Sequence, residues 1–485
     1  MSPFSTRLAA VAALFASFTP AWAHDTLDER IARVENGLRL RFAIQGRPVS
    51  TASIAQRMAA LNVPGVSVAV INHGKIEWAR GYGVVEAGGS RAVGTETLFQ
   101  AASISKPVAA LGALHLVEQG KLSLDEDVNH KLIGWKLPAG AQTAESPVTM
   151  RKLLNHSAGA TVHGFRGYAA GEAVPTLPQL LDGAKPANSA PVRVDLPPGS
   201  QSRYSGGGFS VAQLLMTSVS GKDFAPLMTD IVLAPLGMKH STYAQPLPLA
   251  LHGAAATGHD GNGKPVNGKW HTHPEQAAAG LWTTPSDLAR FAIELQQANA
   301  GKSNKLISQE MATQMLTRLK GNFGLGIEVR EVAGERLFMH GGANRGYRAM
   351  LHALTDAGQG AVVMTNSDGG GALALEILRS IAAEYGWKDL RVIEKPVAPV
   401  STATLARYAG NYQIGPMKIA VTSSGDRLIV TAPPFGAQTR EFFPASETAF
   451  FNLNDGAEFA FEANKDGKFD MIINAGQAQR ATPVP

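Results

Sequence analysis

The sequence predicts an α+β fold in two parts: an antiparallel sheet flanked by helices with an inserted helical subdomain, and then a small all-β domain. Three observations carry this prediction. Strand patterns occur near both ends of a unit that ends close to residue 393, and helical patterns with Gly- and Pro-rich loops fill its middle. Beyond residue 400 only short alternating runs remain. A length of 485 residues also exceeds what one hydrophobic core usually organises.

The N-terminal residues predict a secretory signal. Arg7 precedes an apolar run at 8–18, and Ala21-Trp22-Ala23 has the small-x-small pattern of a cleavage site. We expect residues 1–23 to be removed after Ala23, which predicts a periplasmic or secreted bacterial protein. No later stretch has the roughly 18 uninterrupted apolar residues of a membrane span, so we expect none.

Composition excludes several classes of protein. The chain has no cysteine, which rules out disulfides, thiolate metal sites and a cysteine nucleophile. A formal net charge of +5 on so long a chain does not favour nucleic-acid binding, and at most it helps the approach to anionic cell-wall material.

The predicted first domain covers residues 24–393. Helical spacing marks residues 27–38, and β-rich runs at 65–71 and 75–81 flank the turn Asn72-His73-Gly74, which predicts a hairpin. We expect the remaining elements to be helices at 107–119, 209–219, 224–233, 286–298 and 372–385, and strands at 323–330, 337–340, 347–354 and 360–365. Strands at both ends predict one antiparallel sheet, with the substrate pocket between sheet and helices.

The second predicted domain covers residues 401–485, after a linker at 394–400 that carries Pro396 and Pro399. Short alternating runs at 418–421, 427–431 and 458–462 are divided by turn signals such as Asp455-Gly456 and Asp466-Gly467. A meander of this size fits a small barrel or sandwich.

The candidate nucleophile is Ser103 of Ser103-Ile104-Ser105-Lys106, at the start of a predicted helix. This spacing puts a hydroxyl and an amine one turn apart on one helical face, at the positively polarised end. A neighbouring lysine can stabilise the alkoxide or accept its proton, so Lys106 is the candidate activating group.

Two further fragments complete a candidate active site. Tyr204, in a loop before an apolar helix, is a candidate general base if it lies near Ser103 and an ammonium group. His340-Gly341-Gly342-Ala343 ends a strand, and its glycines would let a substrate lie along the backbone. The amides of Ser103 and Ala343 could form an oxyanion hole. A rival His-x-Gly fragment, His259-Asp260-Gly261, lies in a polar stretch that predicts a surface loop.

These fragments, in this order, resemble the Ser-x-x-Lys, Tyr-x-Asn and Lys/His-x-Gly motifs of the class C β-lactamase and penicillin-binding-protein superfamily of serine hydrolases. Further blocks are similar to that family, and together they cover roughly residues 50–390: 153–159, 235–238, 280–291 and 323–326. The resemblance implies a β-lactamase/transpeptidase-like fold and acyl transfer. In that scheme Ser103 attacks the substrate carbonyl. Lys106 and Tyr204 transfer protons, in an order that the sequence leaves open. The residues that bind the substrate are His340, Gly341 and Gly342.

Two departures from the family pattern narrow the range of expected substrates. Gly206 stands where the family has an asparagine, which removes an amide able to bond the acyl side chain. His340 replaces the lysine usual in β-lactamases and, as a mostly neutral group at pH 7, anchors a carboxylate less well. Both favour the esterase and D-amino-acid peptidase branch, and we expect better activity on short acyl esters or small peptides than on cephalosporins. The terminal domain, with Tyr408-Ala409-Gly410-Asn411-Tyr412 near its start, resembles a lipocalin-like appendage of such relatives.

No cofactor or metal is expected. His271-Thr272-His273 has no partner at a metal-ligand spacing and predicts a surface loop, and Gly206-Gly207-Gly208 lacks a dinucleotide-site pattern. The leading hypothesis is an exported serine hydrolase that cleaves an ester or amide, as a carboxylesterase, a D-aminopeptidase or D-carboxypeptidase, or a weak β-lactamase. Its substrate would be a small molecule or a peptide, with the cell wall as one source. The alternatives are a binding or sensing protein that is acylated or occupied without turnover, and a structural wall-associated protein.

Overall fold

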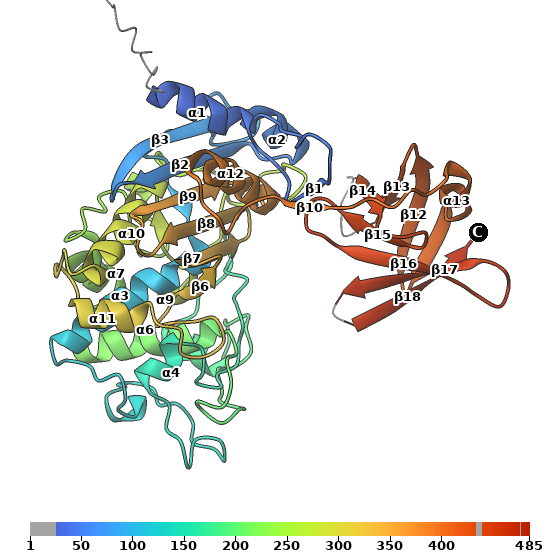
Figure 1. The fold of residues 1–485 in the computed structure, drawn as a ribbon. Coiled ribbons are helices and arrows are strands. Elements are labelled where there is room, and N and C mark those ends of the chain that lie inside the picture. Colours follow the sequence, from blue (N-terminus) through green and yellow to red (C-terminus); the bar gives the residue numbers. More distant parts are fainter. Residues whose placement is uncertain (1–25, 433–438, 476) are drawn as a thin grey trace, which may run out of the picture.

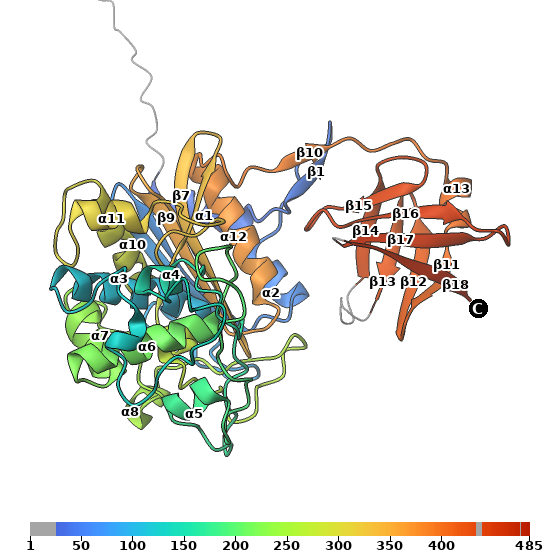
Figure 2. The same cartoon turned by 90° about the horizontal axis from the view of Figure 1, so that it is seen from below.

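The computed structural model describes residues 26–432, 439–475 and 477–485. The predicted signal segment, residues 1–23, lies outside the described residues. Within them the chain forms two units, a sheet covered by helices on both faces and a closed barrel, which lie side by side (Figures 1 and 2).

The larger unit is built on a six-stranded antiparallel sheet in the order β3-β2-β9-β8-β7-β6. β2 (Gly65–Asn72) and β3 (Lys75–Gly83) are the predicted hairpin. The other four strands come from the later part of the unit: β6 (Glu328–Val332), β7 (Glu335–Asn344), β8 (Tyr347–Leu354) and β9 (Gln359–Thr365). β2 pairs with β9 in the middle, which confirms the predicted assembly of one sheet from both ends of the unit.

One predicted strand begins later than expected. We expected a strand over 323–330, but β6 starts at Glu328 and the residues before it form a turn. Gly326 has a φ of 86°, and its N–H donates to Leu154 O, so the backbone leaves the extended path that a strand requires. The turn brings the Phe323 ring beside Tyr204, with centroids 5.9 Å apart.

Helices cover both faces of the sheet (Figures 1 and 2). On one face lie α1 (Leu27–Asn36), α2 (Ile54–Ala60) and α12 (Gly370–Tyr385), and Val34 and Ile377 pack in one cluster with Val68 of β2. On the other lies α10 (Pro285–Asn299), with Phe291 in one cluster with Ala69. Every residue of β2 is buried, as expected of a strand covered on both sides.

The inserted helical part connects β3 to β6 and contains α3 (Ser105–Glu118), the helix that follows the candidate nucleophile. Its other elements are short or lie around α3: β4 (Phe99–Gln100), η1 (Ala102–Ile104), η2 (Val128–His130), α4 (Met150–Leu154), α5 (Leu177–Asp182), α6 (Gly206–Ser220), α7 (Phe224–Met228), η3 (Thr229–Leu233), α8 (Leu249–His252), α9 (Gln276–Ala279), β5 (Trp282–Thr283) and α11 (Gln309–Met315).

A two-stranded parallel ribbon joins the two units. β1 (Phe42–Ile44) pairs with β10 (Ile393–Lys395), which takes in the first residues of the segment predicted as a linker. The Phe42 N–H donates to Leu453 O of the barrel at 3.0 Å, and Lys395 forms an ion pair with Glu458 at 2.7 Å. The ribbon therefore holds the barrel through both backbone and side-chain contacts.

The second unit is a closed eight-stranded antiparallel barrel, which agrees with the predicted small all-β domain. One helix, α13 (Thr402–Arg407), precedes its strands: β11 (Gly410–Ile414), β12 (Met417–Ser424), β13 (Arg427–Thr431), β14 (Thr439–Pro444), β15 (Ala449–Asn452), β16 (Glu458–Ala463), β17 (Phe469–Ala475) and β18 (Gln477–Val484). β11 pairs with β18 and closes the barrel. Aromatic side chains fill the interior, and the Tyr408 and Phe461 rings stack at 4.3 Å.

Candidate active site

Ser103 lies in a tight turn between β4 and α3. The residue before it, Ala102, has a φ of 50°, a conformation that costs a non-glycine residue of order 1–3 kcal/mol. Ser105 holds this turn: its hydroxyl donates to Ala102 O at 2.5 Å and accepts the Leu281 N–H at 3.0 Å. The strained backbone is therefore fixed by buried hydrogen bonds, and Ser103 is left partly exposed.

Lys106 is buried directly behind Ser103. Its Nζ donates to Ser103 Oγ at 3.1 Å and to Ala278 O of α9 at 2.8 Å, and the residue is only 2% exposed. The same Nζ lies 4.9 Å from the centroid of the Tyr204 ring, within reach of a cation–π interaction. The amine predicted to activate Ser103 thus has a fixed position between the hydroxyl, a carbonyl and an aromatic face.

Tyr204 lies at the start of α6 among aromatic rings. Ser205 caps this helix by accepting the Gly208 N–H at 2.9 Å. The Tyr204 ring has centroid distances of 4.4 Å to His156, 4.9 Å to His163 and 6.1 Å to His340. In the described part of the chain, the Tyr204 hydroxyl makes no hydrogen bond, so it remains available within the site.

His340 is held as a neutral imidazole on β7. Its Nδ1 donates to Gly341 O at 2.7 Å, and its buried Nε2 has no hydrogen-bond partner among the described residues. Burial, together with the positive charge of Lys106, lowers the pKa of His340 to about 3. The side chain therefore offers a lone pair rather than a positive charge at neutral pH.

The glycines of β7 allow a close approach to the turn that carries Ser103. A Cβ on Gly342 would come within 2.2 Å of Ala101 O, so only glycine fits there. β6 pairs with β7 over residues 335–339 and stops at Met339, so the stretch from His340 to Asn344 has no β6 neighbour on its outer edge.

A cavity of about 760 Å³ contains all of these groups. Ser103, Lys106, Tyr204, His340, Gly341, Gly342 and Ala343, the residues singled out in the sequence, all line it. It also reaches past Gly341 to the opposite side of β7, where Met350 of β8 and Leu375 of α12 form its wall. This extension of the cavity is lined by α12, which lies about 270 residues after Ser103 in the sequence. No sequence pattern indicated that α12 would line the cavity.

The space beside Gly206 is filled from another loop. A Cβ at Gly206 would meet the Phe165 ring at 3.0 Å and His163 O at 3.2 Å. The missing asparagine of the second motif thus coincides with a loop that occupies its side-chain space, a feature that the sequence did not reveal.

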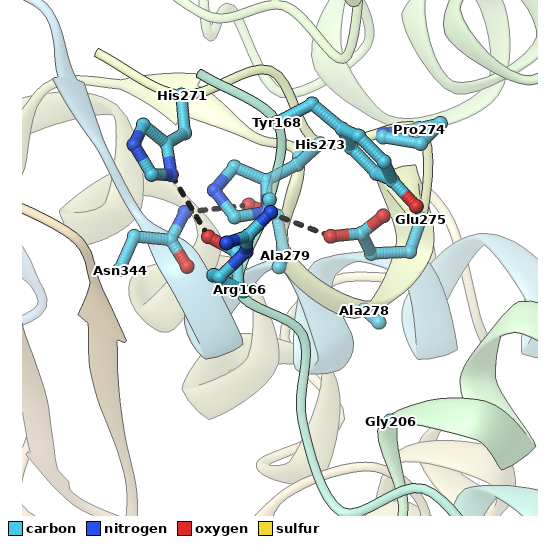
Figure 3. A network of polar contacts seen from close by, with 12 residues as sticks. Arg166, Tyr168, Gly206, His271, His273, Pro274, Glu275, Ala278, Ala279 and Asn344 are labelled. Carbon is cyan, nitrogen blue, oxygen red and sulfur yellow. Dashed lines mark hydrogen bonds and ion pairs between the residues drawn. The ribbon is translucent and has the colours of Figure 1, made fainter. Parts of the chain in front are cut away.

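A polar network supports α9, the helix whose carbonyl holds Lys106 (Figure 3). Asn344 Nδ2 donates to Gln100 Oε1 at 2.8 Å and to Ala279 O at 3.2 Å. On the other side, His273 Nδ1 donates to Glu275 Oε1 at 2.7 Å. Asn344 directly follows the third motif, which ends at Ala343. This position next to the motif was the only feature of the sequence that pointed to Asn344.

Two histidines expected on surface loops are buried instead, which corrects that expectation. His259 and His273 are both 0% exposed. His259 Nδ1 donates to Asn366 O at 2.9 Å and its Nε2 accepts the Ala87 N–H at 3.0 Å, so the imidazole satisfies two backbone groups while its polar neighbours face solvent. His259 does not line the cavity of Ser103.

His156 is a further residue of the site for which the sequence suggested no role. Its Nδ1 accepts the Ser205 N–H at 3.2 Å, and burial holds its pKa well below the usual range, with the charge of Lys106 acting in the same direction. The ring of the neutral His156 therefore packs against the Tyr204 ring.

The described residues contain neither a cluster of metal-ligating side chains nor a membrane-spanning helix. Among them, no three or more His, Asp or Glu side chains are grouped so as to hold a metal ion. No helix within the described ranges combines the length and apolar character needed to cross a bilayer.

Comparison with known proteins places this site in a family. The chain is 25% identical over 370 residues to penicillin-binding protein 4 of Amycolatopsis lactamdurans, covering 73% of this chain and 93% of that protein. It is 28% identical over 235 residues to esterase EstB of Burkholderia gladioli, covering 45% and 58% of the two chains. The solved octameric penicillin-binding protein homologue from Pyrococcus abyssi has a TM-score of 0.58 at 23% identity, with 88% and 98% coverage.

Family models match both units. The barrel region, residues 394–481, corresponds to a domain of unknown function, DUF3471. Residues 51–385 match the model named Beta-lactamase, which is more than half of the chain. The protein therefore belongs to the beta-lactamase family.

Proposed function

We propose that this protein is a serine hydrolase that cleaves an ester or amide through an acyl-enzyme on Ser103. The observation that carries the proposal is the 3.1 Å contact between Lys106 Nζ and Ser103 Oγ inside a cavity that also holds Tyr204 and His340. Ser103 Oγ would attack the carbonyl carbon, the leaving group would depart with a proton, and water would then release the acyl group.

Tyr204, in its phenolate form, is the proposed proton acceptor for Ser103. Lys106 already donates hydrogen bonds to Ser103 Oγ and Ala278 O, so its amine acts as a donor that stabilises a developing alkoxide. The phenol oxygen of Tyr204 has no competing hydrogen bond among the described residues, and its ring lies against Lys106 Nζ. In the second half-reaction the same pair would activate water.

The backbone of β7 is the proposed binding edge. The amides of Ser103 and Ala343 would stabilise the oxyanion. From His340 onward, β7 pairs with β8 but no longer with β6, and this β6-free edge would take an extended substrate beside Gly341 and Gly342 as an added strand. Because His340 is neutral, substrate contact there would use its backbone and its Nε2 lone pair rather than a charge.

The proposed substrates are short acyl esters or small D-amino-acid peptides, including peptides from the cell wall. Phe165 occupies the space of the missing asparagine amide, and the third motif supplies no cation, which disfavours cephalosporins. The similarity to an enzyme named esterase EstB supports the same branch. We also propose export to the periplasm or exterior, on the signal pattern at residues 1–23.

A second candidate function is acylation without efficient turnover, as in a penicillin-binding or sensing protein. The similarity to penicillin-binding protein 4 and the absence of the second-motif amide favour it. Steady-state hydrolysis distinguishes the two: a hydrolase turns over many ester molecules, whereas a sensor releases one equivalent of product and stops.

The test is intact-mass analysis after treatment with a fluorophosphonate, on the wild type and Ser103→Ala. One adduct on the wild type and none on the variant is the expected result. Equal labelling of both proteins, or full ester turnover by Ser103→Ala, would refute the assignment. A shortened N-terminus after Ala23 in the exported protein would support cleavage of the signal.

A further inference from the structure

A second hollow of about 270 Å³ lies beside the active-site cavity, on the α12 side of the sheet. Met350 and Leu375 line both, so the two spaces adjoin at this pair of side chains. Further apolar side chains line the hollow from β6, β7, α12, the segment before β10 and the start of β10 itself: Val332, Leu337, Met339, Leu378, Leu390 and Ile393.

Arginines give this apolar hollow a positive charge. Arg41, Arg330, Arg379 and Arg391 line it, against the single carboxylate of Asp389. Asp389 lies 3.0 Å from His352 Nε2, and Arg330 forms an ion pair with Glu328 at 2.5 Å. Among the residues that the structure describes, Arg41, Arg379 and Arg391 have no carboxylate partner in the hollow.

Arg379 is the decisive residue. It is only 8% exposed, yet within the described chain its guanidinium makes no hydrogen bond and no ion pair. Burial lowers the pKa of Arg379 and nearby Arg41 acts in the same direction, whereas Glu376 opposes them. A buried guanidinium without a partner is costly, and an anion that reached it would remove that cost.

The nearby carboxylates are already engaged. Glu376, one turn before Arg379 on α12, accepts two hydrogen bonds from Arg57 at 2.6 and 2.8 Å. Arg379 also borders the gap between α12 and the barrel, where Asp455 is paired with Arg440 at 2.7 Å. In the described part of the chain, neither Glu376 nor Asp455 is therefore left to pair with Arg379.

We propose that this hollow binds an organic anion, a carboxylate on an apolar chain, with the carboxylate on Arg379 and the chain against Met339, Met350 and Leu375. A guanidinium pairs with a carboxylate through two parallel hydrogen bonds, and the methionines supply an adaptable apolar surface. This site does not require Ser103, so it stands or falls separately from the proposed hydrolase activity.

Decanoate is the probe for the test, titrated calorimetrically into the full-length Ser103→Ala variant so that turnover cannot contribute heat. Saturable one-site binding is expected, and adding Arg379→Gln is expected to weaken it about tenfold or more, because a charged hydrogen bond is lost. Arg318→Gln is the matched control: Arg318 is exposed and does not line the hollow, so binding should be unchanged.

Further ligands test which part of decanoate is recognised, and further variants control for misfolding of Arg379→Gln. Decanol and acetate should each bind at least tenfold more weakly than decanoate, since each lacks one half of the proposed ligand. Arg41→Gln and Arg391→Gln change exposed side chains that need not disturb the core, and each should weaken binding measurably. No saturable binding, an equal loss in Arg318→Gln, or equal binding of decanol or acetate would overturn the proposal.

Discussion

The two units of this chain use their interiors in opposite ways. The barrel closes its sheet and fills the inside with aromatic side chains such as Tyr408, Phe450 and Phe461. The larger unit, which carries Ser103, leaves a cavity of about 760 Å³, and beside it the Nε2 atoms of His156 and His340 are buried without a hydrogen-bond partner among the described residues. Among the described residues, the buried side-chain N and O atoms without a hydrogen-bond partner all belong to the larger unit, some of them next to its cavity, whereas the barrel interior is closely packed.

The largest expected effect tests whether chemistry is confined to the cavity. Tyr204→Phe removes one oxygen, and we expect kcat/KM for a short acyl ester to fall about 10²- to 10⁴-fold, the range for loss of a general base. Thermal unfolding should be unchanged, because the ring contacts with His156 and His163 remain. Tyr412→Phe makes the same change in the barrel, where the hydroxyl bonds Tyr408 O at 2.8 Å, and should leave turnover intact. Activity of Tyr204→Phe within twofold of the wild type would contradict the assignment.

A matched pair of core substitutions tests whether stability is divided between the units. Phe461→Ala in the barrel and Phe291→Ala on α10 each remove a buried ring, and each should cost about 3–5 kcal/mol of unfolding free energy in its own unit. Differential scanning calorimetry should show that each variant moves a different transition. Ester hydrolysis below the transitions should survive Phe461→Ala. Loss of turnover in that variant would show that the barrel takes part in chemistry.

Gly206→Asn tests how the second motif departs from the family pattern. The new side chain would collide with the Phe165 ring, so we expect a loss of about 1–3 kcal/mol in stability and no gain in cephalosporin hydrolysis. Adding Phe165→Ala should recover part of that stability by opening the space. Stability and cephalosporin turnover, measured on the single and double variants, check this. A fully stable Gly206→Asn would mean that the 163–165 loop moves aside readily.

The smallest effect concerns pH. An unfolded histidine takes up a proton below about pH 6.5, whereas the pKa of folded His340 is about 3. Between these values the unfolded state binds more protons, so the free energy of unfolding falls as pH falls, by at most about 1.4 kcal/mol per pH unit for this group. Urea unfolding at pH 5 and pH 7 should show a smaller drop in His340→Asn than in the wild type. His130→Asn, which changes an exposed histidine, should match the wild type.

The sheet, the barrel and the cluster around Ser103 could be predicted because they follow local patterns: a β-rich run and a turn signal in the β2–β3 hairpin, turn signals in the barrel and Ser-x-x-Lys at the start of α3. The start of β6 could not, because Gly326 bonds a residue of α4 far away in the sequence. His259 was placed at the surface on the polarity of its neighbours, although its ring turns inward to bond backbone groups. Phe165 beside Gly206 and the α12 wall of the cavity depend on long-range packing that spacing does not encode.

The ribbon of β1 and β10 has a consequence for the order of folding. Phe42 and Ile393 are paired, although 350 residues separate them in the chain. During synthesis β1 emerges early and has no ribbon partner until almost the whole larger unit has been made. The contacts of Phe42 and Lys395 with the barrel depend on the same ribbon. We therefore expect the barrel to dock only after the two ends of the larger unit have paired.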